Sequence, residues 1–191
     1  MATSDGVTVE AKMQGGLMKS LKRSVLGGES LFIATAQGGW VDCAANLPGD
    51  AVVRTVGGGK TLNMSRGSFL VCESGVEIDT QWGGFQNLFG GEGGFLVHAS
   101  GEGEVVAACY GALDTISLGP GEKVVVDSGH MVAYDDTVSM SIRRVAGTMT
   151  SLKSGEGLVF DFTGPGEVLT QTRNPSALIS WLTTVLPFTR Q

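Results

Sequence analysis

Short runs of apolar or alternating residues, separated by glycine-rich turns, fill most of the chain. FLVHASG at 95–101, EVVAACYG at 104–111 and KVVVDSG at 123–129 are rich in the β-branched and aromatic residues that favour strands. VSMSIRR at 138–144 alternates, as a strand with one buried face does. A Gly-Pro-Gly turn at 119–121 separates two of these runs. Short strands with frequent turns predict an all-β fold of the sandwich or barrel kind.

The same pattern repeats along the chain at an offset of about 63 residues. GGESLFIATAQG at 27–38 matches GGEGGFLVHASG at 90–101, and 90 − 27 = 63. A third copy, GEGLVFDFTGPGEV, follows at 155–168. An offset that holds through Glu, Phe, Ala and Gly positions predicts three pseudo-repeats in one domain spanning 1–191. Their approximate bounds are 15–77, 78–141 and 142–173.

The C-terminal tail at 174–187 differs from the repeats and predicts a short helix. Asn174 suits the N-cap, Pro175 suits the first helical turn, and Pro187 ends the pattern. Apolar residues recur between them at helical spacing, at Ala177, Leu178, Trp181, Leu182 and Val185. Because this spacing gives the helix one apolar face, we expect it to dock against the sheets.

The segments before the three Gly-Glu turns, at 17–29, 82–92 and 146–156, occupy equivalent places in the repeat. In a pseudo-threefold arrangement they would emerge on one face. Their apolar side chains either fold inward or form an exposed patch, which would mark a binding or oligomer interface. We predict an interaction surface that contains Leu17, Leu21, Trp82, Phe85, Phe89 and Leu152.

Composition narrows the classes of partner. Glycine accounts for 30 of 191 residues, and the net charge is −6. An acidic surface repels phosphate at long range, so nucleic-acid binding is not expected. The basic clusters at 19–23 and 143–144 are interpreted as solvated surface charges.

Cysteine usage and the N-terminus indicate a location. Cys43, Cys72 and Cys109 are odd in number, form no CxxC pair and lie in apolar runs, so we expect buried free thiols in a reducing compartment. The first residues resemble neither a secretory signal nor a transit peptide. No apolar run approaches the roughly 18 residues that a spanning helix needs. A cytoplasmic location is therefore predicted.

The residues of common catalytic sites are sparse. The chain has two histidines, His98 and His130, and no HxH pair, so neither a metal nor another cofactor is expected. Asp127, Ser128 and His130 are the residue types of a nucleophilic triad, but adjacency in sequence does not create triad geometry. We interpret this stretch as a turn and predict no catalytic residue and no enzymatic activity. A hydrolase that uses Ser128 or His130 is kept as an alternative.

Four stretches resemble the family of altered inheritance of mitochondria protein twenty-four. They are GGESLF at 27–32, GGEGGFLVHASGEGEV at 90–105, VVVDSGHMVAYDD at 124–136 and the long stretch at 154–182. Asp-Ser-Gly-His and Thr-Arg-Asn-Pro are the most specific parts. The resemblance implies a fold similar to the trp RNA-binding attenuation protein, in the double-stranded β-helix class. Fungal members are mitochondrial inner-membrane proteins, whereas no transit peptide is expected in this chain.

The function expected from these observations is a non-enzymatic binding or assembly domain. Its partner would be another protein or further copies of the chain, with a homotrimer as one form, or a membrane surface. The alternative from the attenuation-protein fold is a small-ligand or RNA-binding protein, although a shared fold does not by itself imply a shared function. The attenuator's lysine-rich RNA-binding rim has no counterpart here.

Overall fold

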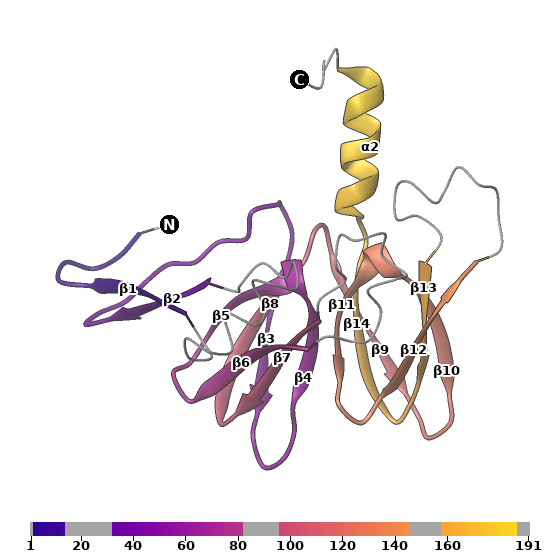
Figure 1. Ribbon diagram of the computed structural model, residues 1–191, viewed down its shortest axis with the longest axis horizontal. Helices are drawn as coiled ribbons and strands as arrows, with labels where there is room; N and C mark the ends of the chain where they lie inside the picture. Colours follow the sequence, from indigo (N-terminus) through magenta and orange to yellow (C-terminus); the bar gives the residue numbers. More distant parts are fainter. Residues whose placement is uncertain (1, 14–31, 82–95, 146–157, 187–191) are drawn as a thin grey trace.

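Antiparallel strands dominate the computed structural model, which describes residues 2–13, 32–81, 96–145 and 158–186 (Figure 1). The strands of the first half are β1 (Thr8–Met13), β2 (Phe32–Gln37), β3 (Ala51–Val56), β4 (Leu62–Ser65), β5 (Phe69–Cys72), β6 (Val76–Gln81), β7 (Leu96–Gly101) and β8 (Gly103–Ala108). Those of the second half are β9 (Leu113–Leu118), β10 (Lys123–Asp127), β11 (Met131–Asp135), β12 (Ser139–Arg144), β13 (Leu158–Thr163) and β14 (Gly166–Gln171). The helix α2 (Pro175–Val185) follows. The prediction of an all-β fold with a short C-terminal helix is confirmed.

The strands form one large sheet, two three-stranded sheets and a separate pair. The large sheet has the order β6-β7-β4-β11-β14-β9. The smaller sheets are β3-β8-β5 and β10-β13-β12, and β1 pairs with β2. All these strand pairs are antiparallel. Since β4 pairs with β11, the large sheet contains strands from both halves of the chain.

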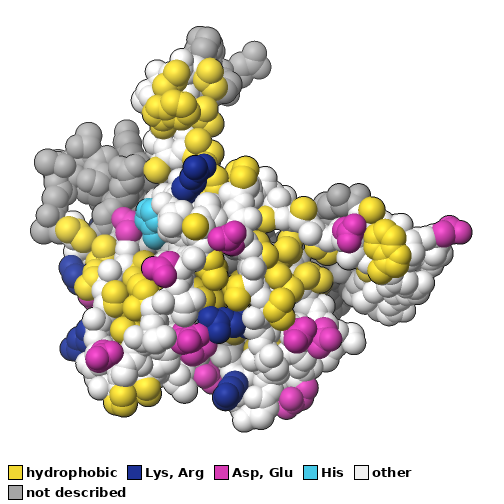
Figure 2. Space-filling model, turned by 180° about the vertical axis from the view of Figure 1, so that it is seen from behind, with side chains coloured by type: hydrophobic (Ala, Val, Ile, Leu, Met, Phe, Trp, Pro, Cys, Tyr) yellow, Lys and Arg dark blue, Asp and Glu magenta, His cyan; other side chains and the backbone are white. Residues whose placement is uncertain are grey.

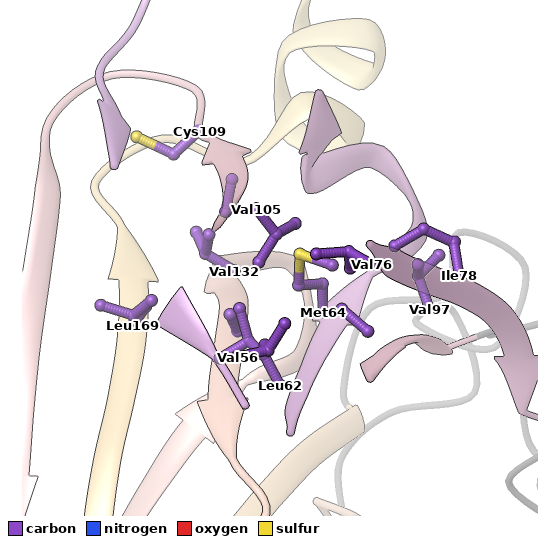
Figure 3. Packing of buried hydrophobic residues seen from close by; sticks show 13 residues of the cluster. Val56, Leu62, Met64, Val76, Ile78, Val97, Val105, Cys109, Val132 and Leu169 are labelled. Carbon is purple, nitrogen blue, oxygen red and sulfur yellow. The ribbon is translucent and has the colours of Figure 1, made fainter. Parts of the chain in front are cut away.

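Two hydrophobic cores lie on opposite sides of β11 and β14. The first core contains residues of β3, β4, β6, β7 and β8, together with Ala133 and Leu169 from the two shared strands (Figure 3). The second core contains Tyr134 and Val168 from the same two strands. Val168 and Leu169 are adjacent, are 0% and 1% exposed, and belong to different cores. These strands are apolar on consecutive positions because both of their faces are covered.

Aromatic rings fill the second core. Phe162 is fully buried, and its ring centroid lies 5.2 Å from that of Tyr134 and 5.9 Å from that of Phe160. Burial raises the pKa of Tyr134 to about 12. Val126 and Ile142 face Phe160 from the neighbouring strands β10 and β12. The alternation of VSMSIRR therefore corresponds to a strand with one face in this core, as the sequence predicts.

The helix α2 begins as predicted but does not dock. Asn174 is its N-cap and Pro175 its first residue, and it ends at Val185. No residue of α2 is buried, and the side chains of Ile179 and Trp181 are 60% and 59% exposed. The expectation of a helix docked against the sheets was wrong, because helical spacing shows which residues share a face but not what covers that face.

Three further expectations stay predictions. They are the double-stranded β-helix, the three repeats and the cytoplasmic location. None of the helices in the described ranges combines the length and the hydrophobicity that a membrane span requires.

We predict that Leu169→Ala lowers the free energy of unfolding by about 3 kcal/mol. Leu169 is 1% exposed and lies where β14 contacts the first core, so the shortened side chain leaves a cavity there. Urea denaturation measures the loss. Val9→Ala, at a valine that is 59% exposed, is the control and should change stability by less than about 0.5 kcal/mol. Equal effects of the two substitutions would contradict the packing described.

Candidate functional site

The predicted interaction surface lies outside the described residues. Its members are Leu17, Leu21, Trp82, Phe85, Phe89 and Leu152. The strands that flank these three segments are described: β1 pairs with β2, β6 with β7, and β12 with β13. The strand ends on either side of each segment therefore lie next to one another.

The two stretches most specific to the family resemblance, 127–130 and 172–175, meet at the base of α2. Gln171 directly precedes the second stretch and contacts the first: its Nε2 donates to the Gly129 carbonyl at 2.9 Å. Its Oε1 accepts from the N–H of Tyr110, which lies outside both stretches, at 2.8 Å. His130 Nδ1 lies 2.7 Å from the Gln171 carbonyl oxygen, which makes this nitrogen the donor. Sequence separation conceals this cluster, because its two stretches lie about 40 residues apart.

Asn174 joins the helix to this cluster. Its Oδ1 accepts from the N–H groups of Ser176 and Ala177, at 2.9 and 3.4 Å, and so caps α2. Its side chain also lies against Gly129, where an added Cβ would overlap with the Asn174 amide. Glycine at 129 is therefore required by close packing. These contacts fix the first turn of α2 relative to the sheets.

The same contacts occupy the groups that a catalytic relay would need. The Asp127 carboxylate accepts from the Gly129 N–H at 2.9 Å, which confirms its interpretation as a turn residue. His130 Nδ1 bonds the backbone at Gln171, whereas a triad requires a carboxylate there. The other histidine, His98, bonds Asn63 Oδ1 at 3.0 Å. Within the described ranges, no group of three or more His, Cys, Asp or Glu residues is arranged to hold a metal ion.

Of the three cysteines, Cys43 is exposed, Cys72 is half-buried and Cys109 is buried. The expectation that all three are buried is wrong for Cys43, since the segment before β3 that contains it lies on the surface. Burial raises the pKa of the Cys72 and Cys109 thiols above the ordinary value. All three are free thiols, as predicted.

The outer strand β10 is more exposed than its apolar sequence suggests. Among the described strands it pairs only with β13, and Val125 at its centre is 52% exposed. The strand β4, by contrast, has neighbours on both sides, and its central residue Asn63 is 9% exposed. An unpaired strand edge can hydrogen-bond to another chain. Sequence reasoning missed this edge, because a run of valines predicts a strand but not how many neighbours it has.

Apolar side chains are also exposed on α2, which projects from the body of the molecule (Figure 2). From Asn174 to Leu186 the helix segment has no ionisable residue. The hydroxyls of Thr183 and Thr184 donate to carbonyls of their own helix, both at 2.7 Å. The surface of α2 is therefore uncharged over its whole length.

The comparison with known families agrees with the resemblance seen in the sequence. Residues 1–173 match the mitochondrial biogenesis AIM24 family. The chain belongs to this family. The match ends before α2, so the family relationship concerns the β-strand body and the 172–173 part of the cluster at its top.

The chain is similar to an uncharacterized protein of Streptococcus pyogenes serotype M6. It is 31% identical over 195 residues, which cover 96% of this chain and 78% of that protein. An X-ray structure of a protein from Streptococcus pyogenes is similar with a TM-score of 0.77 and 28% sequence identity, covering 97% of this chain and 85% of that one. The fold is thus shared with that protein, while the likeness to the attenuation protein stays a prediction.

We predict that Asn174→Ala frays α2 without unfolding the sheets. Loss of the N-cap costs about 1 kcal/mol, which corresponds to about fivefold faster opening of the helix. Hydrogen exchange of the amides at 175–186 measures the change. Asn46→Ala, at an exposed asparagine outside the cluster, is the matched control. Unchanged exchange in Asn174→Ala would show that the cap does not hold the helix.

We predict that iodoacetamide modifies Cys43 first at neutral pH. A raised pKa leaves less thiolate at a given pH, so the half-buried and buried thiols react more slowly and gain reactivity as the pH rises. Peptide mass spectrometry of a labelling time course identifies the order. Cys43→Ser should remove the fast phase, and a fast phase that persists in this variant would contradict the described exposure.

Proposed function

We propose that the chain is a non-enzymatic assembly domain that associates with further copies of itself through the β10 edge. The observation that supports this most is the pairing of β4 with β11, in which Asn63 lies opposite Tyr134. This pairing connects two similar groups of strands inside one chain. The strand that corresponds to β4 in the second group is β10, and its outer edge has no neighbour among the described strands.

The two groups of strands have the same order and the same neighbours. β8 lies between β3 and β5 in the first group, as β14 lies between β9 and β11 in the second. β7 lies between β6 and β4, as β13 lies between β12 and β10. Five of the six equivalent strand pairs begin 62 or 63 residues apart, for example 113 − 51 = 62 for β3 and β9 and 166 − 103 = 63 for β8 and β14, and β4 and β10 begin 123 − 62 = 61 residues apart.

Equivalent side chains make equivalent hydrogen bonds in the two groups. The Glu73 carboxylate accepts from the Glu104 N–H at 2.9 Å, and the Asp135 carboxylate accepts from the Glu167 N–H at 2.8 Å. The offsets are 135 − 73 = 62 and 167 − 104 = 63. A carboxylate that holds the same backbone amide in both groups supports a repeated unit.

The strands β1 and β2 support a third unit. Gly38, just after β2, and Gly101, the last residue of β7, have φ angles of +94° and +95°, and 101 − 38 = 63. Each lies against a carbonyl oxygen before the partner strand, that of Gly6 and that of Gly75 respectively. The pair β1-β2 therefore corresponds to β6-β7. We include the three-unit repeat in the proposal on these grounds.

The pairing of β4 with β11 joins one unit to the next inside the chain. The last unit has the equivalent strand β10, so its edge is available for the same pairing with another chain. Inside the chain the edge of β4 is paired with β11 and Asn63 is 9% exposed, whereas the equivalent edge of β10 has no neighbour among the described strands and Val125 (125 − 63 = 62) is 52% exposed. Repeated head-to-tail contacts either close into a ring or grow into a filament. We expect a closed ring, with a homotrimer as its form.

The test is the mass of the particle in solution. Light scattering after size-exclusion chromatography should give a multiple of the chain mass of 19.8 kDa for the wild type. Val125→Lys should weaken association by about a hundredfold, because a charge would be buried without a partner. Since Val125 is exposed in the single chain, its fold should be retained.

Val53→Lys is the matched control, because Val53 is 54% exposed on the separate strand β3. It should leave association unchanged. A wild-type protein that is a monomer at all concentrations would reject the proposed function. Equal loss of association in the two variants would show that β10 is not the contact.

A further inference from the structure

We infer that the strand which receives β10 is the N-terminal segment at 2–4 of a second copy. The inference rests on the proposed function, because it identifies the other half of the same contact. Inside the chain β11 receives β4. Two segments correspond to β11 in the other units: β5, which precedes β6, and residues 2–4, which precede β1.

Residues 2–4 already form one side of a strand ladder. The Ser4 N–H donates to the Trp40 carbonyl at 3.1 Å, and the Asp42 N–H donates to the Ala2 carbonyl at 2.8 Å. Thr3 pairs with Val41 in an antiparallel bridge. Among the described residues, this ladder lies on one side of the segment only. The segment thus has an edge to offer to another strand.

The same ladder exists beside β5. There the Glu73 N–H donates to the Glu104 carbonyl at 2.9 Å, at the point where the chain leaves β5 for β6. Ser4 stands at the matching point before β1. β11 differs from both because it is covered on both sides, by β14 and by β4. A strand from a second copy that paired with β5 or with residues 2–4 would therefore supply the second neighbour that β4 supplies to β11.

The strand β5 is disfavoured as the receiver because the chain's own β2 stands in the way. Ile33 on β2 packs against the first core, as Leu96 on β7 belongs to the second core. The pair β1-β2 therefore holds the position beyond β5 that β6-β7 hold beyond β11. If β10 of a second copy paired with β5, the neighbouring β13 of that copy would have to occupy the place of β2. Beyond residues 2–4, no described element occupies the equivalent place.

The repeat also predicts the register of the contact. Asn63 lies opposite Tyr134 in the internal pairing. Val125 corresponds to Asn63, since 125 − 63 = 62, and Cys72 corresponds to Tyr134, since 134 − 72 = 62. Gly6 and Gly75 are equivalent residues, so the N-terminal unit and the next unit differ by 75 − 6 = 69 at this point. Thr3 therefore corresponds to Cys72, since 72 − 3 = 69. Val125 of one copy should therefore lie opposite Thr3 of the other.

The chemistry of the two strands suits this pairing. Three valines, 124–126, would oppose Ala2, Thr3 and Ser4, and none of these six residues is ionisable. Two β-branched side chains directly opposite one another stabilise an antiparallel pair. No charge is buried within these three pairs, but the same register places Lys123 opposite Asp5, both of which are exposed, so the association should weaken modestly as the ionic strength rises.

Disulfide trapping tests the register directly. In a chain with Cys43→Ser and Cys72→Ser, one preparation receives Val125→Cys and a second receives Thr3→Cys. The remaining Cys109 is 5% exposed. Mixed and oxidised with glutathione disulfide, the two preparations should give a cross-linked dimer between positions 125 and 3. The Cβ atoms of directly opposed residues are about 4.5–5.5 Å apart, within reach of a disulfide after a small shift.

The control is built into the sequence, because native Cys72 is the residue that would oppose position 125 if β5 were the receiver. Val125→Cys in a chain that keeps Cys72 and has Cys43→Ser should give about tenfold less cross-linked product, the ratio of a 1.4 kcal/mol preference. More product in this control places the receiver on β5 and overturns the inference, while the proposed function stands. Association through β10 without either cross-link also overturns it. Failure of the wild type to associate at all rejects the proposed function itself.

Discussion

The pairing of β4 with β11 is the constraint on which the rest of this structure depends. It covers only three residue pairs, Leu62 with Asp135, Asn63 with Tyr134 and Met64 with Ala133. It nevertheless makes one sheet from two groups of strands and so places β11 and β14 between two cores. Strand pairing fixes register, and register determines which face each side chain occupies. A shift by one residue would exchange Ala133 and Tyr134 between the cores, which differ greatly in the volume that they accept.

The two faces of β11 and β14 also explain the distribution of apolar residues. A strand with one covered face alternates, whereas these strands are apolar at neighbouring positions because each face meets a different core. The ion pair between Arg54 on β3 and Glu167 on β14, at 2.8 Å, crosses between the groups at the same junction. It is partly exposed and contributes about 1 kcal/mol or less, so apolar packing provides most of the cohesion. The match to the AIM24 family over residues 1–173 includes both groups of strands and the pairing between them.

The sequence predicts local structure well and long-range contacts poorly, for physical reasons. Asn174 and Pro175 specify the start of α2 through backbone chemistry that involves only near neighbours, and the structure agrees. Whether α2 docks depends on surfaces elsewhere, which its own spacing cannot report. The run of valines in β10 likewise predicts a strand but not its open edge. The cluster of Gly129, His130 and Gln171 could be predicted only in part, since its hydrogen bonds join segments about 40 residues apart. The predicted interaction surface falls outside the described residues and stays a prediction.

The central claim is that the pairing of β4 with β11 is used again between chains, at β10. Hydrogen exchange of the amides at 124–126, followed as the protein concentration is raised, measures this most directly. The account predicts that outward-facing amides of β10 become protected as copies associate, while those of β9, on the far edge of the large sheet, do not change. Exchange in β10 that is the same at every concentration, in a sample shown to associate, would contradict it.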